Sequence, residues 1–326
     1  MKANYARYRP QDAKGHYESY FLRANHPERP LAFWIRYTVF SPKGRPEQAI
    51  GELWGMVFDG ETNKHVAAKT ELPISQCHFD PDSFNVQIGD AFLKSGSLSG
   101  KAKTGTREIG WDLSYIGGER PLFLLPLNLY EAPLPKAKAL VGRPHARFAG
   151  TITVNGEPLE IDDWVGSQNH NWGSKHTDLY AWGQVAGFTG APDAFLEVGT
   201  AKLKFGPVWT PYMTVMVLRI DGEEYPLNGL LKSLTAKGSF DYFTWKFSSR
   251  GPGIQVDGTI SAKPADFVGL TYYNPPGGIK HCLNSKIAAC ELTVTAGNRT
   301  QRLVTPHRAA FEILTDDRAH GIPIQV

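Results

Sequence analysis

The sequence predicts a mainly β protein, built as two consecutive antiparallel barrels or half-barrels. Segments in which apolar β-branched and aromatic residues alternate with polar ones recur along the chain, as they do in half-buried strands. Turn dipeptides that suit hairpins lie between or beside them, at Asp59-Gly60, Asn155-Gly156 and Asp221-Gly222. The chain also has 33 Gly and 23 Pro in 326 residues, and 12% of it is aromatic, a composition typical of short strands joined by turns.

Alternation also places the individual strands. In chain order we expect strands at residues 16–24, 31–40, 51–59, 107–116, 145–154, 178–187, 194–205, 212–220, 240–248, 253–262 and 290–296. The best helical candidate is residues 282–290, but this segment is short and equally suits the lead-in to the strand that follows it.

A proline-rich segment predicts the domain boundary. Residues 119–144 contain five prolines, which make a regular strand or helix hard to sustain. We therefore place the boundary near residue 140, with one β domain at 1–140 and a second at 141–326. A barrel of about eight strands is wide enough to hold one small ligand.

Charge, apolar runs and cysteine use exclude several classes of protein. The 35 basic and 32 acidic residues leave a net charge of +3, too mild for a nucleic-acid partner. No apolar run reaches the roughly 20 residues that span a bilayer, and none near the start resembles a signal-peptide core. The three cysteines form no CxxC pair, which fits a reducing compartment. We expect a cytoplasmic protein without a transmembrane segment, for which transient contact with a membrane surface remains an alternative; its oligomeric state stays open.

The densest polar and aromatic segment is residues 166–185, GSQNHNWGSKHTDLYAWGQV. Alternation places Tyr180, Trp182 and Gln184 on one face of a strand. These residue types suit a barrel lining, because Trp and Tyr combine apolar area with one directed hydrogen bond. The residues before them, Gln168 to Trp172, equally suit a loop that bonds within itself and does no chemistry.

Neither a metal site nor a nucleophilic serine is predicted. His170 and His176 are separated by five residues, a spacing that suits neither one strand face nor one helical turn. Ser167 and Ser174 lack the G-x-S-x-G setting of a nucleophile elbow. We therefore expect chemistry without a metal or cofactor.

The motif at residues 170–173, HNWG, followed by Tyr180-Ala-Trp182-Gly-Gln184, resembles a known family. This is the lipocalin-like group that contains bacterial carotenoid 1,2-hydratase (hydroxyneurosporene synthase), AttH-type proteins, kievitone hydratase and, more distantly, tocopherol cyclase. The approach FAGTITVNGEPLEIDDWVGSQ and the N-terminal HYESYF and AFWIRYTVF are also similar to that family. The resemblance is sharp over about 40 residues and patchy elsewhere.

The resemblance implies two consecutive lipocalin-like β domains and a hydrophobic cavity. It also implies that His170 and Trp172 are at an active site. The family has a downstream tyrosine and aspartate at this site, and the aspartate has no clear counterpart here. Tyr180, Gln184 and Glu197 are the nearest downstream candidates.

The residues support acid-catalysed chemistry on an alkene. A carboxyl group in an apolar pocket stays protonated near neutral pH, and Asp163 and Glu197 are the candidate acids. Trp172, Trp182 and Tyr180 can stabilise the cation that forms. His170 can orient the acid or the attacking water. The residues expected to bind substrate are Trp182, Gln184, Asn171, Gln168 and His176.

The leading hypothesis is therefore a cofactor-independent enzyme that hydrates, cyclises or isomerises a hydrophobic isoprenoid or polyketide-like small molecule. The main alternative is a non-catalytic carrier of a lipid or polyene. A structural protein with filled barrels is a third. Each candidate also has a purely structural interpretation: Glu197 can face solvent, and the two tryptophans can be core residues.

Overall fold

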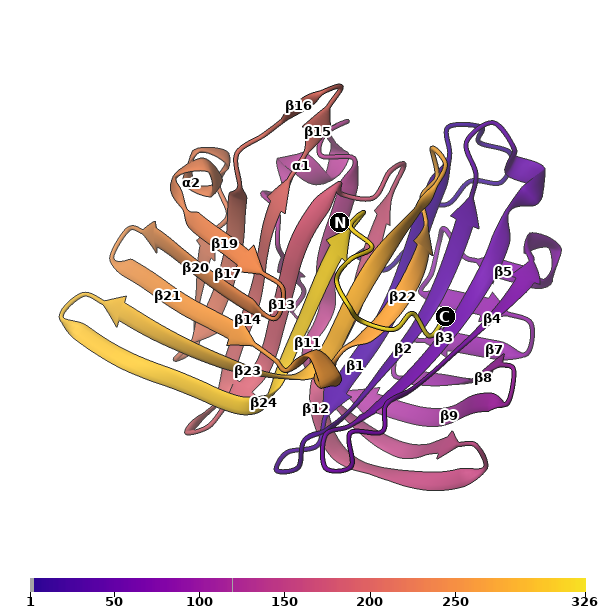
Figure 1. The fold of residues 1–326 in the computed structure, drawn as a ribbon, viewed down its shortest axis with the longest axis horizontal. Helices are drawn as coiled ribbons and strands as arrows, with labels where there is room; N and C mark the ends of the chain where they lie inside the picture. Colours follow the sequence, from indigo (N-terminus) through magenta and orange to yellow (C-terminus); the bar gives the residue numbers. More distant parts are fainter. Residues whose placement is uncertain (1–2, 119) are drawn as a thin grey trace.

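The computed structural model describes residues 3–118 and 120–326, and these form two large antiparallel sheets (Figure 1). The prediction of a mainly β fold with antiparallel sheets is confirmed. The first sheet contains β1 (His16–Asn25), β2 (Leu31–Ser41), β3 (Ile50–Asp59), β4 (Val66–Pro73), β5 (Cys77–Phe79), β6 (Asn85–Ile88), β7 (Ala91–Lys94), β8 (Ser97–Thr104), β9 (Arg107–Ile116), β10 (Leu122–Phe123), β11 (Ala137–Val154) and β12 (Glu157–Gly173).

The second sheet follows it along the chain. It contains β13 (Leu179–Phe188), β14 (Ala191–Lys202), β17 (Met213–Ile220), β18 (Glu223–Leu227), β19 (Lys237–Asp241), β20 (Thr244–Gly251), β21 (Ile254–Ser261), β22 (Val268–Tyr273), β23 (Ile279–Ala296) and β24 (Arg299–Thr315). A separate hairpin is formed by β15 (Lys204–Phe205) and β16 (Val208–Trp209). The helical elements are α1 (Asn128–Glu131), α2 (Leu230–Thr235) and the 3-10 turns Pro46–Gln48, Ile74–Gln76 and Pro264–Asp266.

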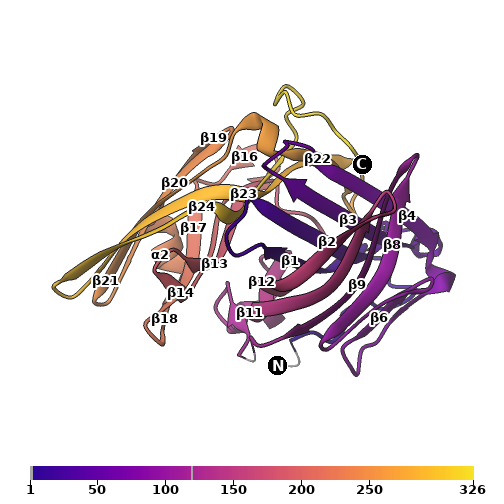
Figure 2. The ribbon, with the colours of Figure 1, turned by 90° about the horizontal axis from the view of Figure 1, so that it is seen from below.

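The first sheet curls into a nearly closed barrel (Figure 2). Its strand order is β4-β3-β2-β1-β12-β11-β9-β8-β7-β6-β5. Threonine side chains join β4 to β8: Thr104 Oγ1 accepts from Lys69 N at 2.8 Å, and Thr70 Oγ1 accepts from Lys103 N at 2.9 Å. These bonds satisfy backbone amides that a sheet edge leaves unpaired.

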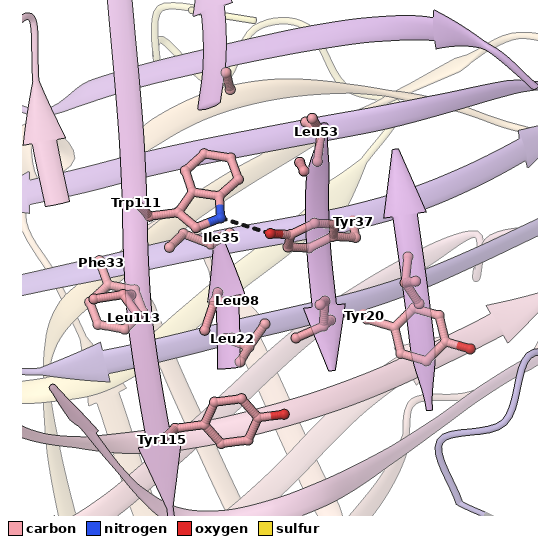
Figure 3. Packing of buried hydrophobic residues seen from close by; sticks show 14 of the residues in the cluster. Tyr20, Leu22, Phe33, Ile35, Tyr37, Leu53, Leu98, Trp111, Leu113 and Tyr115 are labelled. Atoms are coloured by element: carbon pink, nitrogen blue, oxygen red, sulfur yellow. Dashed lines mark hydrogen bonds between the residues drawn. The ribbon is translucent and has the colours of Figure 1, made fainter. Parts of the chain in front are cut away.

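Side chains occupy the interior of this barrel. Figure 3 shows aromatic and aliphatic residues from several strands meeting there, among them Phe33, Tyr37 and Trp111. Trp111 Nε1 donates to Tyr37 Oη at 2.7 Å, so the polar atoms of the two rings are paired inside the core. The ligand cavity implied by the family resemblance therefore does not lie at this level of the first barrel.

The second sheet has the order β18-β17-β14-β13-β24-β23-β21-β20-β19 and encloses a second core. Trp245 lies at its centre, and its Nε1 donates to Thr200 Oγ1 at 3.1 Å. Residues 282–290, for which a helix was one option, belong to the long strand β23. Their tertiary partners on β22 and β24 explain this choice, because pairing on both sides fixes an extended backbone.

The chain changes sheet between Gly173 and Leu179 rather than near residue 140. Residue 140 lies inside β11, which pairs with both β9 and β12 of the first sheet. Four of the five prolines lie between β9 and β11, and Pro144 lies inside β11 next to a shift in its pairing with β12. The chain then returns to the same sheet. The HNWG motif is consequently at the end of β12, in the first sheet.

Among the described residues, no helix is long and apolar enough to cross a membrane.

Candidate functional site between the two sheets

Successive side chains of β1, β2 and β3 point to opposite faces of the first sheet, and both faces are buried. One face lines the first barrel, and the other packs against β13, β22, β23 and β24. Aromatic pairs cross this boundary: Phe21 meets Trp182 edge-on at a centroid distance of 5.7 Å, and Trp54 meets Tyr272 at 5.8 Å. We call this region the inter-sheet layer. Its buried apolar members are Phe21, Ala32, Trp34, Trp54, Met56, Phe58, Ala67, Val268, Leu270, Tyr272, Cys282, Ile287 and Leu314.

Glu197 of β14 is a buried acid at this layer, with 2% of the residue exposed. Its carboxyl oxygens accept from Trp182 Nε1 at 2.7 Å and from Gln184 Nε2 at 2.8 Å. Burial raises the pKa of Glu197 to about 7, although these two hydrogen bonds and the charge of Arg23 oppose the rise. A carboxyl group with this pKa holds a proton for much of the time at neutral pH.

A buried hydrogen-bond network fixes Gln184 beside this acid. Arg23 Nη1 and Ser167 Oγ donate to Gln184 Oε1 at 3.3 and 2.6 Å. The amide nitrogen of Gln184 donates to Asn169 Oδ1 at 2.8 Å as well as to Glu197. Arginine can only donate, so its contact identifies the amide oxygen and fixes which end of Gln184 faces the acid.

A second buried charge lies in the same layer. Lys286 Nζ donates to Glu312 Oε1 at 2.7 Å, and Asn284 Nδ2 donates to the same oxygen at 3.1 Å. Burial lowers the pKa of Lys286, while the neighbouring Glu312 opposes that change. The ammonium group lies 5.8 Å from the ring centroid of Trp34 and 5.6 Å from that of Trp182, within range of cation–π attraction.

A small cavity lies at another part of the layer. It offers about 10 Å³ of room, close to what one water molecule needs. Arg36 Nε and Thr38 Oγ1 are buried there without a hydrogen-bond partner among residues 3–118 and 120–326. Burial, with help from Arg36, lowers the pKa of His176 to about 3, so its imidazole is neutral. The lining consists of Tyr17, Arg36, Thr38, Phe40, Glu52, His176, Tyr272 and Tyr273.

His170 and Trp172 lie on the opposite face of β12 from Asn169 and away from this layer. His170 stacks on Tyr20, a core residue of the first barrel, at a centroid distance of 4.3 Å. Its Nε2 lies 2.8 Å from Glu18 Oε1 and its Nδ1 lies 2.7 Å from the backbone oxygen of Ala3. Both neighbours can accept a hydrogen bond, so each ring nitrogen of His170 has a polar partner.

Glu18 is the buried carboxylate beside this histidine. Burial alone would raise the pKa of Glu18, but hydrogen bonds with His16 and His170 outweigh it and hold the pKa well below its ordinary value. The carboxylate also accepts from the backbone amides of Arg7 and Tyr8, at 2.7 to 2.9 Å. A buried carboxylate with this many donors is a fixed anion, and the chain near residues 3–8 covers it.

The other predicted residues divide between these two places and the surface. Tyr180, Trp182 and Gln184 share one face of β13, as alternation predicted, and that face is turned toward the inter-sheet layer. Gln168 is buried on the His170 side, where Asn4 Nδ2 donates to its Oε1 at 2.7 Å. Asn171 is half-buried on β12.

Asp163 is not in an apolar pocket, which corrects its prediction as an acid. Its side chain is 49% exposed and forms an ion pair with Arg147. The backbone of Asp163 has a φ of +56° next to an irregularity in the β11–β12 pairing, and this bend turns the carboxylate outward.

The sequence pattern did not single out Lys286 or Glu312, and it does not determine which way Glu18 and Arg36 face. The sequence feature that could have revealed these residues is a charged side chain inside an otherwise apolar strand. Whether such a position is buried depends on packing against the second sheet. Alternation alone does not reveal that both faces of a strand are buried.

Among the described residues, no three His, Cys, Asp or Glu side chains gather as metal ligands would. A hollow of about 490 Å³ lies elsewhere, against largely polar side chains of β19, β20, β21 and β23. Its lining is unlike that of a site for an apolar ligand.

Comparison with known proteins gives relatives of low identity. No protein-family model matches the chain. Two uncharacterized proteins from two strains of Mycobacterium tuberculosis are each 27% identical to it over 194 residues. These matches cover 60% of this chain and 57% of each relative, less than two thirds of the relatives' length.

Solved structures share the fold over most of the chain. An AttH protein from Nitrosomonas europaea has a TM-score of 0.57 at 10% identity, covering 92% of this chain and 91% of that one. Kievitone hydratase from Nectria haematococca has a TM-score of 0.58 at 13% identity, covering 93% and 89%. CghA has a TM-score of 0.53 at 12% identity, covering 93% and 88%. The resemblance that the HNWG segment indicated is thus confirmed at the level of the fold.

Proposed function

We propose that this protein is a cofactor-independent enzyme that hydrates or cyclises a hydrophobic small molecule by protonating a carbon–carbon double bond, with Glu197 as the acid. The observation that carries the proposal is the state of Glu197: a fully buried carboxyl group with a pKa of about 7, held by two neutral donors at the inter-sheet layer. Alkenes are weak bases, so their protonation needs an acid shielded from water.

The geometry leaves the acid free to act. Trp182 and Gln184 occupy one position on each carboxyl oxygen, and each oxygen has a second lone pair or proton position. In the reaction, the proton of Glu197 forms a new C–H bond and leaves a carbocation. For hydration, water adds its oxygen to the cation and returns a proton to the carboxylate. For cyclisation, a second double bond attacks the cation, and a later proton loss restores the acid.

The surroundings favour a cation over a neutral alkene. The Trp182 indole is bonded to the acid itself, and Phe21 packs edge-on against that ring. Aromatic faces stabilise a nearby cation by about 0.5–2 kcal/mol each. The buried ammonium of Lys286 would oppose this, but Glu312 offsets its charge at 2.7 Å.

Entry of substrate to Glu197 requires side chains of the layer to move apart, since the cavity of about 10 Å³ lies at another part of the layer and is not lined by Glu197. The half-buried pair Phe40 and Tyr273, at a centroid distance of 5.4 Å, lines that cavity and is the proposed point from which the layer opens. Support from comparison is limited to the fold: one protein that shares it bears the name of a hydratase.

The test compares Glu197→Gln with Asp163→Asn, a carboxyl-to-amide change at an exposed site. Each purified variant is incubated with prenylated phenols, including kievitone, and with acyclic polyenes in water labelled with heavy oxygen. We expect the wild-type protein and Asp163→Asn to give labelled alcohol or cyclised product, and Glu197→Gln to lose at least about 100-fold in rate. The wild-type rate should fall as pH rises through about 7, because the acid loses its proton.

Full turnover by Glu197→Gln would refute the assignment of the acid. If the wild-type protein binds these compounds and converts none of them, the non-catalytic carrier is the better description. His170 and Trp172 remain predicted site residues, and a His170→Ala variant that folds would test the role of this histidine in the same assay.

A further inference from the structure

Large apolar side chains are exposed at one end of the molecule. Eight of the eleven large apolar residues that are exposed in the described chain belong to three segments: the hairpin β15–β16, helix α2, and the region around α1. These elements lie along the upper edge of the molecule in Figure 1. The eight residues are Leu127, Leu134, Phe205, Val208, Trp209, Leu230, Leu231 and Leu234, with exposed fractions of 40% to 78%.

The three segments are tied to the same part of the second sheet. Asn228, just before α2, donates from Nδ2 to the backbone oxygen of Phe123 at 3.2 Å. Gly199 of β14, the strand that leads to the hairpin, lies beside Leu124; a Cβ at this glycine would be 4.0 Å from Leu124 Cδ2. The region before α1 therefore lies beside both β14 and the start of α2, and the three segments follow the same edge of the molecule (Figure 1).

Helix α2 exposes its apolar side chains and buries a polar one, the opposite of an ordinary surface helix. Its leucines Leu230, Leu231 and Leu234 face outward, while Ser233 is buried with 4% exposure. A surface helix normally buries its apolar residues and exposes its polar ones. Exposed apolar groups gathered in this way mark a surface that contacts another apolar phase.

Basic residues accompany the apolar ones. Residues 201–212 contain Lys202 and Lys204 and no Asp or Glu, and residues 228–240 contain Lys232 and Lys237 and no Asp or Glu. The ammonium groups of Lys202 and Lys204 lie 5.8 and 5.6 Å from the ring centroid of Trp209. The nearest acids in sequence are Glu197, which is buried, Glu224, which forms an ion pair with Arg219, and the exposed Asp241. Asp178 is engaged by Lys175 and by the backbone of Lys204, and Glu131 lies at the end of α1.

We infer that this edge docks on the surface of a lipid bilayer that contains anionic lipids. Tryptophan and leucine insert among the headgroups and the first part of the acyl chains of a bilayer, and lysine pairs with anionic headgroups. An anionic bilayer surface therefore suits both the apolar and the basic residues of this edge. The apolar groups stand on separate projecting elements, an arrangement suited to a soft surface. This inference concerns binding and does not depend on Glu197; if the proposed chemistry fails, the docking edge is unaffected.

The experiment measures sedimentation of the full chain with phosphatidylcholine vesicles that either contain or lack phosphatidylserine. We expect binding to the vesicles with phosphatidylserine, weaker binding to those without it, and a blue shift of tryptophan emission that Trp209→Phe reduces. The double variant Lys202→Gln with Lys204→Gln should bind about 30-fold more weakly, since each lysine near an anionic surface contributes about a factor of five. Leu230→Ser with Leu231→Ser should also weaken binding.

Matched controls come from the far side of the first barrel. Lys101→Gln with Lys103→Gln removes two exposed lysines of β8, and Ile116→Ser removes an exposed apolar residue of β9 with 69% exposure. Both should leave vesicle binding unchanged. The inference is overturned if the wild-type protein binds neither kind of vesicle, if the controls weaken binding as much as the edge variants, or if the leucine variants abolish a dimer in solution, since the edge would then be a contact between copies.

Discussion

Replacement of Glu197 by Gln should change how the stability of the protein depends on pH. In the folded state the pKa of Glu197 is about 7, against an ordinary value of 4.5 that applies to the unfolded chain. A group whose pKa is raised on folding stabilises the folded state below its unfolded pKa, and this contribution is lost as pH rises through the folded pKa. At 1.36 kcal/mol for each pH unit, the difference amounts to about 3 kcal/mol between about pH 4 and pH 8.

The glutamine side chain of the Glu197→Gln variant cannot ionise, so this variant should not lose this part of its stability as pH rises. Its absolute stability carries a separate cost, because its NH2 group must replace one of two oxygens that both accept hydrogen bonds, from Trp182 and Gln184. An unmatched buried donor costs about 1–3 kcal/mol at any pH. The diagnostic quantity is therefore the slope: relative to the wild-type protein, the variant should gain about 3 kcal/mol in free energy of unfolding from about pH 4 to pH 8.

Urea unfolding followed by tryptophan fluorescence at several pH values measures this slope. Glu291→Gln is the matched control, because Glu291 is exposed and its pKa is lowered by a hydrogen bond from Arg302. That variant should gain nothing relative to the wild-type protein as pH rises. A stability difference for Glu197→Gln that stays constant with pH, or that moves in the opposite direction, would refute the protonated state on which the proposed function depends.

Three further changes test other parts of the structure. Glu18→Gln should lower the free energy of unfolding by about 3–5 kcal/mol near pH 7, as measured by urea unfolding, because it removes a buried carboxylate that accepts from the backbone amides of Arg7 and Tyr8 and lies 2.8 Å from His170 Nε2. Lys286→Met should destabilise by a similar amount through the unpaired carboxylate of Glu312, while the double change Lys286→Met with Glu312→Leu should recover most of the loss, which thermal unfolding would show. Asp163→Asn should change the free energy of unfolding by less than about 0.5 kcal/mol, since the ion pair it breaks is exposed; a larger loss would contradict the outward position of this side chain.

Local pattern was sufficient to predict the β fold and the shared face of Tyr180, Trp182 and Gln184. Alternation records which residues share a face, because successive side chains point to opposite sides of a strand. It does not record what that face packs against. The carboxyl of Glu197 thus has the same local pattern whether it meets water or Trp182, and only the pairing of β13 with β14, in which Gln184 is opposite Glu197, decides between them.

The position of the HNWG motif was not predictable from composition. Prolines between residues 119 and 144 suggested that one domain ends and another begins there. The chain instead returns through β11 to the sheet it left, and this return depends on long-range pairing with β9 and β12. Asp163 is a similar case: an acid next to Trp164 resembles a buried acid in sequence, and one positive φ turns it into solvent.

The motif itself is divided by strand alternation. His170 contacts Glu18 and Tyr20 on one face of β12, whereas Ser167 and Asn169 on the other face point toward Gln184 and, through it, toward Glu197. β12 therefore carries, on one face, the histidine that contacts Glu18 and, on the other face, the residues that hold Gln184 beside Glu197. Any shift of β12 by a single residue would exchange the two sets of side chains, so that His170 would enter the inter-sheet layer and the amide network would be lost. The contact of His170 with Glu18 thereby fixes the register on which the environment of Glu197 depends, which gives His170 a physical connection to the proposed acid without contact between them.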